Sequence, residues 1–266
     1  MPEGHTIHRL ARDQQADLKG QAVAAWSPQG RFADGAQLID GAVLRRSDAW
    51  GKHLFHTWST GLLLHVHLGL IGKFVRRAAP PPQPVGAVRL RLEGPTATWD
   101  LSGPVICDVI TPAERDAVVA RLGPDPLRAD ADPQRFVRRV SKSHRPIGDL
   151  LLDQAVIAGV GNVYRAEFLY LTGIHPSTPG SALSETQLMA IWDLAVVQLK
   201  LGMRRNRIVT IDPSELRGPI AKVRRGEGVH VYHQEVCRRC GSTIEQAELA
   251  GRRIDACPTC QPRAVG

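Results

Sequence analysis

Apolar and polar residues change their spacing along the chain, and the first part of the pattern predicts one helix followed by strands. Near the start, apolar residues recur at helical spacing before a stop at Gly20: Ile7, Leu10, Ala11 and Leu18. From about Gly20 to Val109 the segments are short, partly alternating and broken by Gly and Pro: KHLFHTW, LLLHVHL, VRLRLE and TATWDLS. We therefore expect an N-terminal helix and an antiparallel sandwich or barrel.

The pattern becomes helical after RLGPDPL at 121–127. It continues through DPQRFVRRV, the long run at 145–173 and SETQLMAIWDLAVVQLKLGM. Inside the long run we expect a helix over 146–158, a turn of Gly159, Val160 and Gly161, and a second helix with Asn162 as its N-cap.

These changes predict an α+β multidomain protein. We assign a β-sandwich domain with its N-terminal helix to residues 1–125 and a helical domain to 126–223. A basic, cysteine-rich metal module follows at 224–266, and the Pro-rich stretch at 79–86 is expected to be a surface loop.

The charge of the chain favours a polyanionic partner. There are 34 Lys and Arg against 26 Asp and Glu, giving a net charge of +8 and a pI of about 9.7. No apolar run approaches the roughly 20 residues that span a bilayer, and no secretory signal pattern is visible. Five cysteines, four of them near the end, do not resemble a secreted disulfide framework, so we expect a cytoplasmic protein.

The strongest single motif is Cys237-x2-Cys240-x16-Cys257-x2-Cys260. Two such cysteine pairs supply four thiolates and suit a tetrahedral Zn²⁺, with a disulfide pairing as the alternative. The residues between them can form a two-stranded ribbon. Because all four ligand positions are cysteine, we expect structural zinc. Cys107, far away in a strand segment, is expected to be a small buried hydrophobe.

Two further features are weaker. The Gly-rich turn before Asn162 places free N–H groups at the positive end of a helix and so suits a phosphate, although a corner without a ligand is the plain alternative. A dinucleotide fingerprint is disfavoured, because Tyr164 replaces its third Gly and a helix precedes the motif. Four closely spaced histidines suggest a metal cluster, which we disfavour because no carboxylate lies beside them: His53, His56, His65 and His67.

The order of these motifs resembles the formamidopyrimidine-DNA glycosylase/endonuclease VIII family over essentially the whole chain. The resemblance rests on Pro2-Glu3-Gly4, Lys52, Gly159-x-Gly161-Asn162 and the four cysteines; MPEG and LLLDQAVIAGVGNVYRAE are closer to the actinobacterial endonuclease VIII branch. It implies a helix–two-turn–helix domain and a zinc β-hairpin that bind damaged double-stranded DNA. It also implies base excision followed by strand cleavage at the abasic sugar.

The resemblance implies catalytic roles at the N-terminus. Pro2, freed as a secondary amine once Met1 is removed, would attack C1′ and form an imine, Glu3 would donate and accept protons, and Lys52 would assist at the sugar–phosphate. A reference α-amine has a pKa of about 7.7–8.0, and the positive end of a helix lowers it further, which favours the neutral nucleophile. The iminium then acidifies the C2′ proton, so that β- and δ-elimination follow.

The resemblance also implies DNA contacts. Asn162 would contact a phosphate, and Arg121 in RLGPD would contact the backbone. Arg252 in GRRID would be the zinc-hairpin arginine, counted among both the catalytic and the DNA-binding residues, with Arg253 as the adjacent alternative. Leu70 in HLGLIGKF would be the apolar wedge that fills the gap left by the extruded nucleotide.

Several residues depart from the family pattern and leave the lesion preference open. Thr6 stands where many members carry Glu, and Gly69 and Ile71 replace a Gln and a Tyr of endonuclease VIII. The segment DLSGPVIC at 100–107 lacks the Arg-rich loop of the formamidopyrimidine branch. We expect a monomer that favours oxidised pyrimidines. The alternatives are an enzyme for oxidised purines such as 8-oxoguanine and a non-catalytic zinc-ribbon DNA-binding protein.

Overall fold

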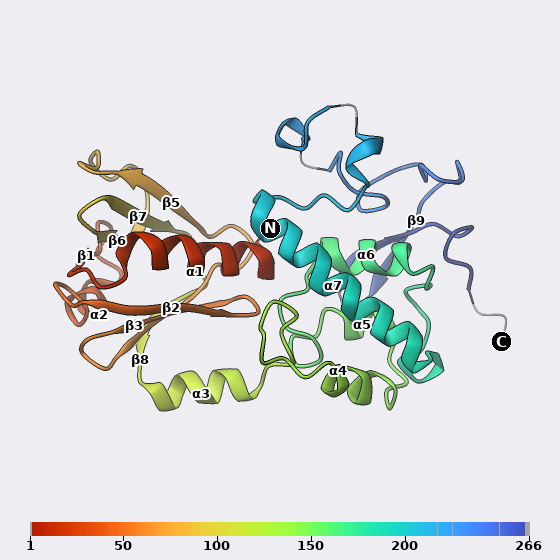
Figure 1. Cartoon of the computed structure of the whole chain (residues 1–266), viewed down its shortest axis with the longest axis horizontal. Helices are drawn as coiled ribbons and strands as arrows, with labels where there is room; N and C mark the ends of the chain where they lie inside the picture. The colour runs from red at the N-terminus through yellow and green to blue at the C-terminus, as the bar shows by residue number, and fades with distance from the viewer. Residues whose placement is uncertain (1, 217, 225, 250, 264–266) are drawn as a thin grey trace. The chain divides into compact units, whose positions relative to one another are not determined.

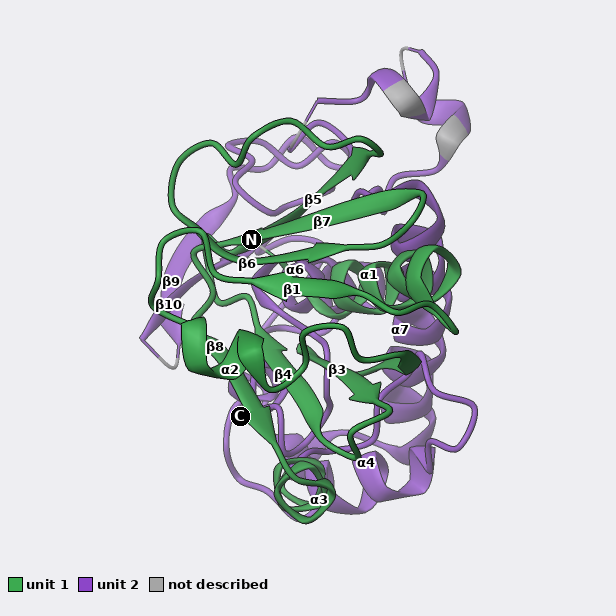
Figure 2. Cartoon of the chain, turned by 90° about the vertical axis from the view of Figure 1, so that its left-hand side faces the viewer, with its two compact units in different colours: residues 1–121 green, residues 122–266 purple. Residues whose placement is uncertain are grey.

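The computed structural model describes residues 2–216, 218–224, 226–249 and 251–263. The chain divides into two compact units, residues 1–121 and 122–266, coloured green and purple in Figure 2. Among the described residues, no helix is long and apolar enough to span a membrane.

In the described part of the first unit, the chain forms two antiparallel four-stranded sheets and three helices, most of which are labelled in Figure 1. Its elements are α1 (Gly4–Leu18), β1 (Ala24–Trp26), α2 (Ala33–Gln37), β2 (Leu44–Trp50), β3 (His53–Trp58), β4 (Leu63–His67), β5 (Lys73–Ala78), β6 (Val88–Glu93), β7 (Ala97–Ser102), β8 (Ile106–Ile110) and α3 (Pro112–Ala120). The sheet orders are β1-β6-β7-β5 and β2-β3-β4-β8. The predicted N-terminal helix and antiparallel strands are confirmed.

One apolar core joins the two sheets and makes this unit a sandwich. Leu54 and Leu64 of one sheet pack in the same buried cluster as Leu92 and Trp99 of the other. Strand β2 buries some side chains and exposes others, whereas β4 and β7 are buried at nearly every position, which explains why the sequence pattern alternates only in part. Cys107 is 6% exposed in β8, and burial raises the pKa of its thiol to about 12, as expected of a small core residue.

The second unit is helical and ends in a β-hairpin. Its α-helices and strands are α4 (Pro133–Val140), α5 (Ile147–Leu150), α6 (Asn162–Leu171), α7 (Glu185–Arg205), β9 (Glu245–Leu249) and β10 (Arg252–Ala256). Short 3-10 turns occur at Gly180–Ala182, Pro213–Glu215 and Ile220–Lys222. The predicted helical region and zinc-module ribbon are confirmed, and β9 pairs with β10 in antiparallel register.

The predicted helix over 146–158 is too long, because α5 ends at Leu150. Side chains beyond it satisfy backbone groups in a pair of turns: Asp153 accepts from the N–H of Ala155, and Gln154 donates to the carbonyl of Val160 and accepts from the N–H of Gly159. Asp and its neighbours compete with the helical hydrogen-bond ladder in this way. The apolar spacing that suggested a helix reflects burial of these turns in the core.

The prediction that Asn162 is an N-cap is also wrong. Gly161 occupies the cap position, and Asn162 is the first residue of α6. Helix α6 is buried on nearly all sides: Tyr164 and Phe168 pack in the helical core, whereas Tyr170 packs against the cysteine module.

A buried carboxylate on α6 holds the segment that leads into the cysteine module. Glu167 accepts hydrogen bonds from the N–H groups of His230, Val231 and Tyr232 at 2.7–3.0 Å, and from the hydroxyl of Thr210. A carboxylate with several backbone donors is a strong anchor. The cysteine module is therefore fixed directly to α6.

Candidate functional site

Pro2 and Glu3 lie at the N-terminal end of α1. The carbonyl of Glu3 accepts from the N–H groups of Thr6 and Ile7, so the helix begins directly after the predicted catalytic pair. The Glu3 residue is completely buried, although its side chain does not cap the helix. A carboxyl group at this end lies where the helix dipole is positive.

The first turn of α1 also accounts for one departure from the family pattern. The Thr6 hydroxyl lies 3.2 Å from Nε2 of His5, which is itself buried. Burial lowers the pKa of His5 to about 4, so the imidazole is neutral at pH 7. At position 6, where many relatives carry a carboxylate, this chain has a hydroxyl group that contacts the neutral imidazole of His5.

Three of the four clustered histidines share one face of the β3–β4 pair, where they stack. His53 is opposite His67, and Phe55 is opposite His65. Nδ1 of His53 lies 2.9 Å from Nε2 of His65, and the His53 ring centroid lies 4.9 Å from that of His67. Nδ1 of His67 accepts from the N–H of Gly69, so neutral His67 carries its proton on Nε2.

The histidines are uncharged at pH 7, and two cations lie near them. Burial, followed by the repulsion that a protonated His53 would meet from the protonated forms of His67 and His65 and from Arg121 and Lys52, in that order, lowers the pKa of His53 to about 3. The predicted catalytic Lys52 and the predicted DNA contact Arg121 are therefore both within electrostatic reach of His53. The four-cysteine group is the one potential metal site among the described residues, so a histidine metal cluster is not supported.

The predicted wedge lies on an exposed loop between β4 and β5. The residue exposures are 57% for Leu70 and 83% for Ile71. Val105, at 73% exposure, lies against this loop: a Cβ on Gly69 would come within 2.3 Å of its Cγ2, and Gly69 has a φ of +66°. A Gln at position 69 would therefore be sterically excluded in this chain.

Asn162 lies in the second unit and joins α6 to the hairpin. It is 8% exposed; its Nδ2 donates to the carbonyl of Arg253 at 3.1 Å, and its Oδ1 accepts from Arg165 at 2.6 Å. The side chain of this predicted phosphate-contacting residue thus makes internal hydrogen bonds that the sequence pattern did not indicate.

The adjacent arginines of the hairpin have different surroundings. Arg252 begins β10 and is exposed, whereas Arg253 forms an ion pair at 2.6 Å with Asp255, which is completely buried. Asp255 also accepts from the N–H of His233. Because the guanidinium of Arg253, whose side chain is 39% exposed, is already paired with Asp255, Arg252 is the better placed of the two to contact an external anion.

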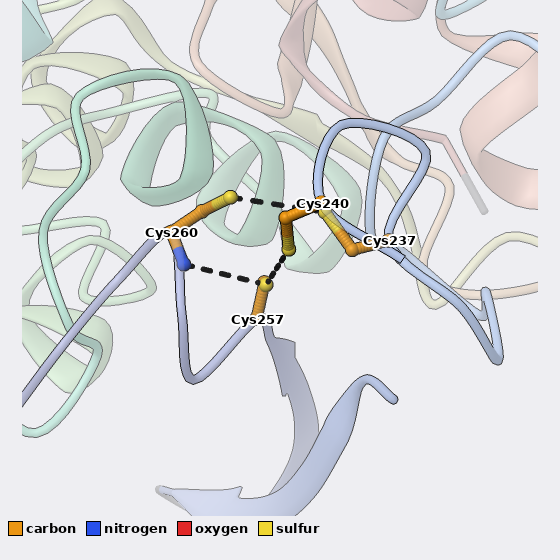
Figure 3. Close-up of side chains that lie close together, drawn as sticks. All are labelled: Cys237, Cys240, Cys257 and Cys260. Carbon is orange, nitrogen blue, oxygen red and sulfur yellow. Dashed lines mark hydrogen bonds between the residues drawn. The ribbon is translucent and has the colours of Figure 1, made fainter. Parts of the chain in front are cut away.

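The four cysteines converge, as Figure 3 shows. All four sulfur atoms lie within 4.8 Å of one another, and the Cys237–Cys260 and Cys240–Cys257 pairs are 3.8 and 3.4 Å apart. A tetrahedral ion with bonds of about 2.3 Å to sulfur has ligand–ligand edges of about 3.8 Å.

The acid–base properties of these thiols also fit a cation. Hydrogen bonding to Ser242 lowers the pKa of Cys240 to about 6, whereas burial and the neighbouring sulfurs raise the pKa of Cys260 to about 12. Four thiolates at this spacing repel one another unless a cation balances their charge. The set therefore fits a bound metal ion.

Four features were not identified from the sequence. Arg165 and Val105 lie in stretches quoted above, but nothing in those stretches indicates a role for either side chain. The exposure of Ile71 could have been inferred, because two apolar residues between glycines in GLIG have little room to fold back into a core. The histidine stack could have been inferred from the alternation of HVH on one strand and HLF on its neighbour.

Comparison with known proteins places the chain in one family. Residues 1–102 match the formamidopyrimidine-DNA glycosylase N-terminal domain, and residues 122–213 match the formamidopyrimidine-DNA glycosylase H2TH domain. The chain is 48% identical to "Endonuclease 8 1" of Mycobacterium tuberculosis over 98% of its own length and 100% of the relative's. It is 30% identical to the formamidopyrimidine-DNA glycosylase of Gloeobacter violaceus, with 98% of each protein covered.

The fold agrees with this assignment. A Lactococcus lactis formamidopyrimidine-DNA glycosylase, solved in complex with DNA that contains an abasic site, matches with a TM-score of 0.81 at 23% identity, covering 98% of this chain and 100% of that one. The resemblance inferred from the motifs, including its closeness to the actinobacterial branch, is confirmed. The chain belongs to the formamidopyrimidine-DNA glycosylase/endonuclease VIII family of base-excision repair enzymes, which are DNA glycosylases with abasic-site lyase activity.

Proposed function

We propose that this enzyme excises oxidised bases, pyrimidines favoured, from double-stranded DNA through an imine at Pro2, and then nicks the strand by β,δ-elimination. The observation that carries the proposal is the buried residue Glu3, directly after Pro2 at the positive end of α1. A proton donor beside an N-terminal secondary amine is the arrangement that imine chemistry requires. The 48% identity to a protein named "Endonuclease 8 1" supports the pyrimidine preference.

The first half of the reaction removes the base. The neutral Pro2 nitrogen, freed by removal of Met1, forms a bond to C1′ as the bond between C1′ and the base breaks. The base leaves with the bonding electron pair and takes up the proton that the Pro2 nitrogen loses. The bond between C1′ and the ring oxygen then breaks, Glu3 protonates that oxygen, and the nitrogen lone pair forms the C=N double bond of an iminium ion.

The second half cleaves the strand. Loss of the C2′ proton to a base moves its electrons toward the iminium and breaks the C3′–O bond, which releases the 3′ phosphate as a leaving group. A second elimination breaks the C5′–O bond. Hydrolysis of the remaining imine by water restores the Pro2 amine, so that no redox cofactor is consumed.

We assign the DNA contacts to residues in both units. Lys52 and Arg121 add positive charge around the neutral histidine stack, and Lys52 assists at the sugar–phosphate. Asn162 and Arg252 contact phosphates from the second unit. Leu70 is the wedge, and its exposure on the loop between β4 and β5 supports this role, because an apolar side chain in solvent gains from insertion into a base stack.

We assign a structural Zn²⁺ to Cys237, Cys240, Cys257 and Cys260. All four positions are thiols at tetrahedral spacing, and Cys237 and Cys257 are nearly or completely buried. The ion would hold the hairpin that carries Arg252 and would supply no catalytic chemistry. We further propose that the enzyme acts as a monomer on damaged DNA in the bacterial cytoplasm, at the nucleoid.

The pyrimidine preference is supported by what lies beside the wedge. The segment after β7 contributes Val105 and contains no arginine, in contrast to the Arg-rich loop expected of the formamidopyrimidine branch. The surface that enters the duplex is therefore apolar at Leu70, Ile71 and Val105.

A panel of duplexes that carry thymine glycol, dihydrouracil or 8-oxoguanine tests the proposal. The rate of base release should be highest for the two pyrimidine lesions, and borohydride should trap a covalent complex on each lesion that is excised. Faster release of 8-oxoguanine would reverse the preference. Binding without trapping on any lesion or on an abasic duplex would indicate a non-catalytic DNA-binding protein.

A further inference from the structure

A buried arginine on α6 contacts both strands of the hairpin. Arg165 is 0% exposed and lies one turn after Asn162 on the same face of the helix. Its Nη2 donates to the carbonyl of Arg253 in β10 at 3.0 Å, and its Nη1 reaches the carbonyl of Leu249 in β9 at 3.5 Å. One guanidinium therefore spans the two strands.

The same guanidinium is anchored to the helical core. Nη1 donates to the carbonyl of Gly148 in α5 at 3.2 Å, and Nη2 donates to Oδ1 of Asn162. Since Asn162 itself donates to the carbonyl of Arg253, that one carbonyl accepts from two side chains of α6. Helix and hairpin are thus joined by a closed set of hydrogen bonds.

These contacts are made beside the exposed arginine of the hairpin. Leu249 is the strand partner of Arg252, and Arg253 follows it directly. The carbonyls of Arg253 and Leu249 both accept hydrogen bonds from α6. The backbone of Arg252 is therefore held by the next residue of its own strand and by its partner on the neighbouring strand. The direction in which its side chain leaves the strand is set by α6.

Packing alone does not require an arginine at this position. Burying a guanidinium costs free energy unless its donors are satisfied, and Met or Leu would fill similar space without that cost. The Nη1 and Nη2 groups of Arg165 donate to carbonyl oxygens of three separate elements: α5, β9 and β10. A planar fork of donors suits such a bridge, and a lysine could not reproduce it.

We propose that Arg165 is a positioning residue for Arg252: through the carbonyls of Leu249 and Arg253 it fixes the paired strands β9 and β10, which present Arg252 to a DNA phosphate. The inference rests on the proposed DNA contact of Arg252. It assigns no direct DNA contact to Arg165, which is buried.

A double-mutant cycle tests this role. The dissociation constant of an abasic-analogue duplex is measured over a range of salt concentrations for wild type, Arg165→Met, Arg252→Ala and the double variant. Arg165→Met should weaken binding roughly tenfold and lower the salt slope by about one unit, as Arg252→Ala does, because one phosphate contact is lost in each. The double variant should bind no more weakly than Arg252→Ala alone.

Controls separate positioning from folding. Arg135→Met removes another arginine of this unit that donates to a backbone carbonyl, that of Leu122, and its effect should multiply with that of Arg252→Ala. Zinc content and a cooperative melting transition identify folded protein. If Arg165→Met does not fold, Arg165→Lys takes its place, since it keeps the charge but not the planar fork.

Two outcomes overturn the inference. If folded Arg165→Met binds like wild type, or if its loss multiplies with that of Arg252→Ala, the two arginines act independently. If the single variant Arg252→Ala keeps wild-type binding and salt slope, Arg252 does not contact a phosphate, and Arg165 then has no positioning role. The two single variants, Arg165→Met and Arg252→Ala, distinguish these cases.

Discussion

Nη2 of Arg253 lies 2.6 Å from Oδ1 of Asp255, a completely buried carboxylate, whereas the side chain of the preceding Arg252 is exposed. Neighbouring residues of a strand point to opposite faces, so two arginines in sequence cannot share one environment. The hairpin therefore contains one arginine that neutralises an internal charge and one that is available to DNA. In the sequence, the two-residue spacing of Arg253 and Asp255 along a strand favours this pairing, but it does not show that Asp255 is buried.

We predict that substitution of Arg252 chiefly affects DNA binding, whereas substitution of Arg253 chiefly affects stability. Arg252→Ala should weaken binding to all duplexes alike and lower the salt slope by about one unit, because phosphate contacts carry little base information. Arg253→Ala should chiefly lower the free energy of unfolding, by roughly 1–3 kcal/mol, since Asp255 loses its charged partner. Gel-shift titrations on lesion and undamaged duplexes, together with thermal melting, measure both. Loss of binding to one lesion only in Arg252→Ala would contradict the phosphate assignment.

The sequence was sufficient for the fold class, and for the positions of Pro2 and Glu3, because helical periodicity and strand alternation are local signals. It failed over residues 151–158, where burial of two turns gives the same apolar spacing as a helix. It also could not show that Asn162 turns inward to Arg253, a residue 91 positions away along the chain. Arg165 was missed for the same reason: its partners distant in sequence are backbone carbonyls, which have no sequence signature.

Leu70→Ala and Ile71→Ala should both impair excision from paired duplex more than from single-stranded substrate, because a wedge is needed only where a stack must be held open. Ile71 is more exposed than Leu70, so the Ile71→Ala variant tests whether this neighbouring residue also acts as a wedge. Val85→Ala is a matched control, since Val85 is 84% exposed in the Pro-rich loop and has no proposed DNA contact. Single-turnover excision rates on the two substrates provide the measurement. Equal losses on both substrates would point to a folding defect.

Removal of the metal should abolish DNA binding as well as lower stability. The hairpin that carries Arg252 is held by Cys257, which is completely buried, and a four-thiol site without its ion is commonly unfolded. Cys257→Ser should therefore lose zinc and affinity for an abasic duplex together. Cys107→Ser, a buried thiol of the first unit, should keep both. If Cys257→Ser binds the duplex with wild-type affinity, the hairpin is not part of the DNA-binding surface.

The fourth clustered histidine, His56, should make the protein sensitive to acid. It is completely buried, and neither ring nitrogen has a hydrogen-bond partner among the described residues. Burial lowers its pKa from 6.5 to about 3. Below pH 6.5 the unfolded chain therefore binds a proton that the folded chain does not, and stability falls as pH falls, by about 1.4 kcal/mol per pH unit until about pH 3.

His56→Leu should remove this contribution. As the pH is lowered from 6.5 to 4, the free energy of unfolding of His56→Leu should fall less steeply than that of the wild type. The other buried histidines still contribute to the pH dependence that the variant retains. Urea unfolding at a series of pH values gives both curves. Parallel curves for the two proteins would show that His56 is not buried in the neutral form.

The final prediction concerns the amine. Retention of Met1, or an uncleaved tag before Pro2, should abolish imine chemistry and leave DNA affinity nearly intact. The reason is covalent: once acylated, the Pro2 nitrogen belongs to a tertiary amide and has no lone pair available to attack C1′. The contacts assigned to Asn162 and Arg252 need no free terminus. Borohydride trapping, strand nicking and gel-shift binding on one abasic duplex measure all of these effects.

Two variants make this test graded. Pro2→Gly replaces the secondary amine by a primary one, which still forms an imine but with different basicity and geometry, so trapping should fall without disappearing. Glu3→Gln should lose base excision while a preformed abasic site is still cleaved through Pro2, because that site needs no base to be expelled. If the blocked protein traps and nicks at wild-type rates, Pro2 is not the nucleophile. Lys52, the amine predicted to assist at the sugar–phosphate, would then be the first residue to substitute.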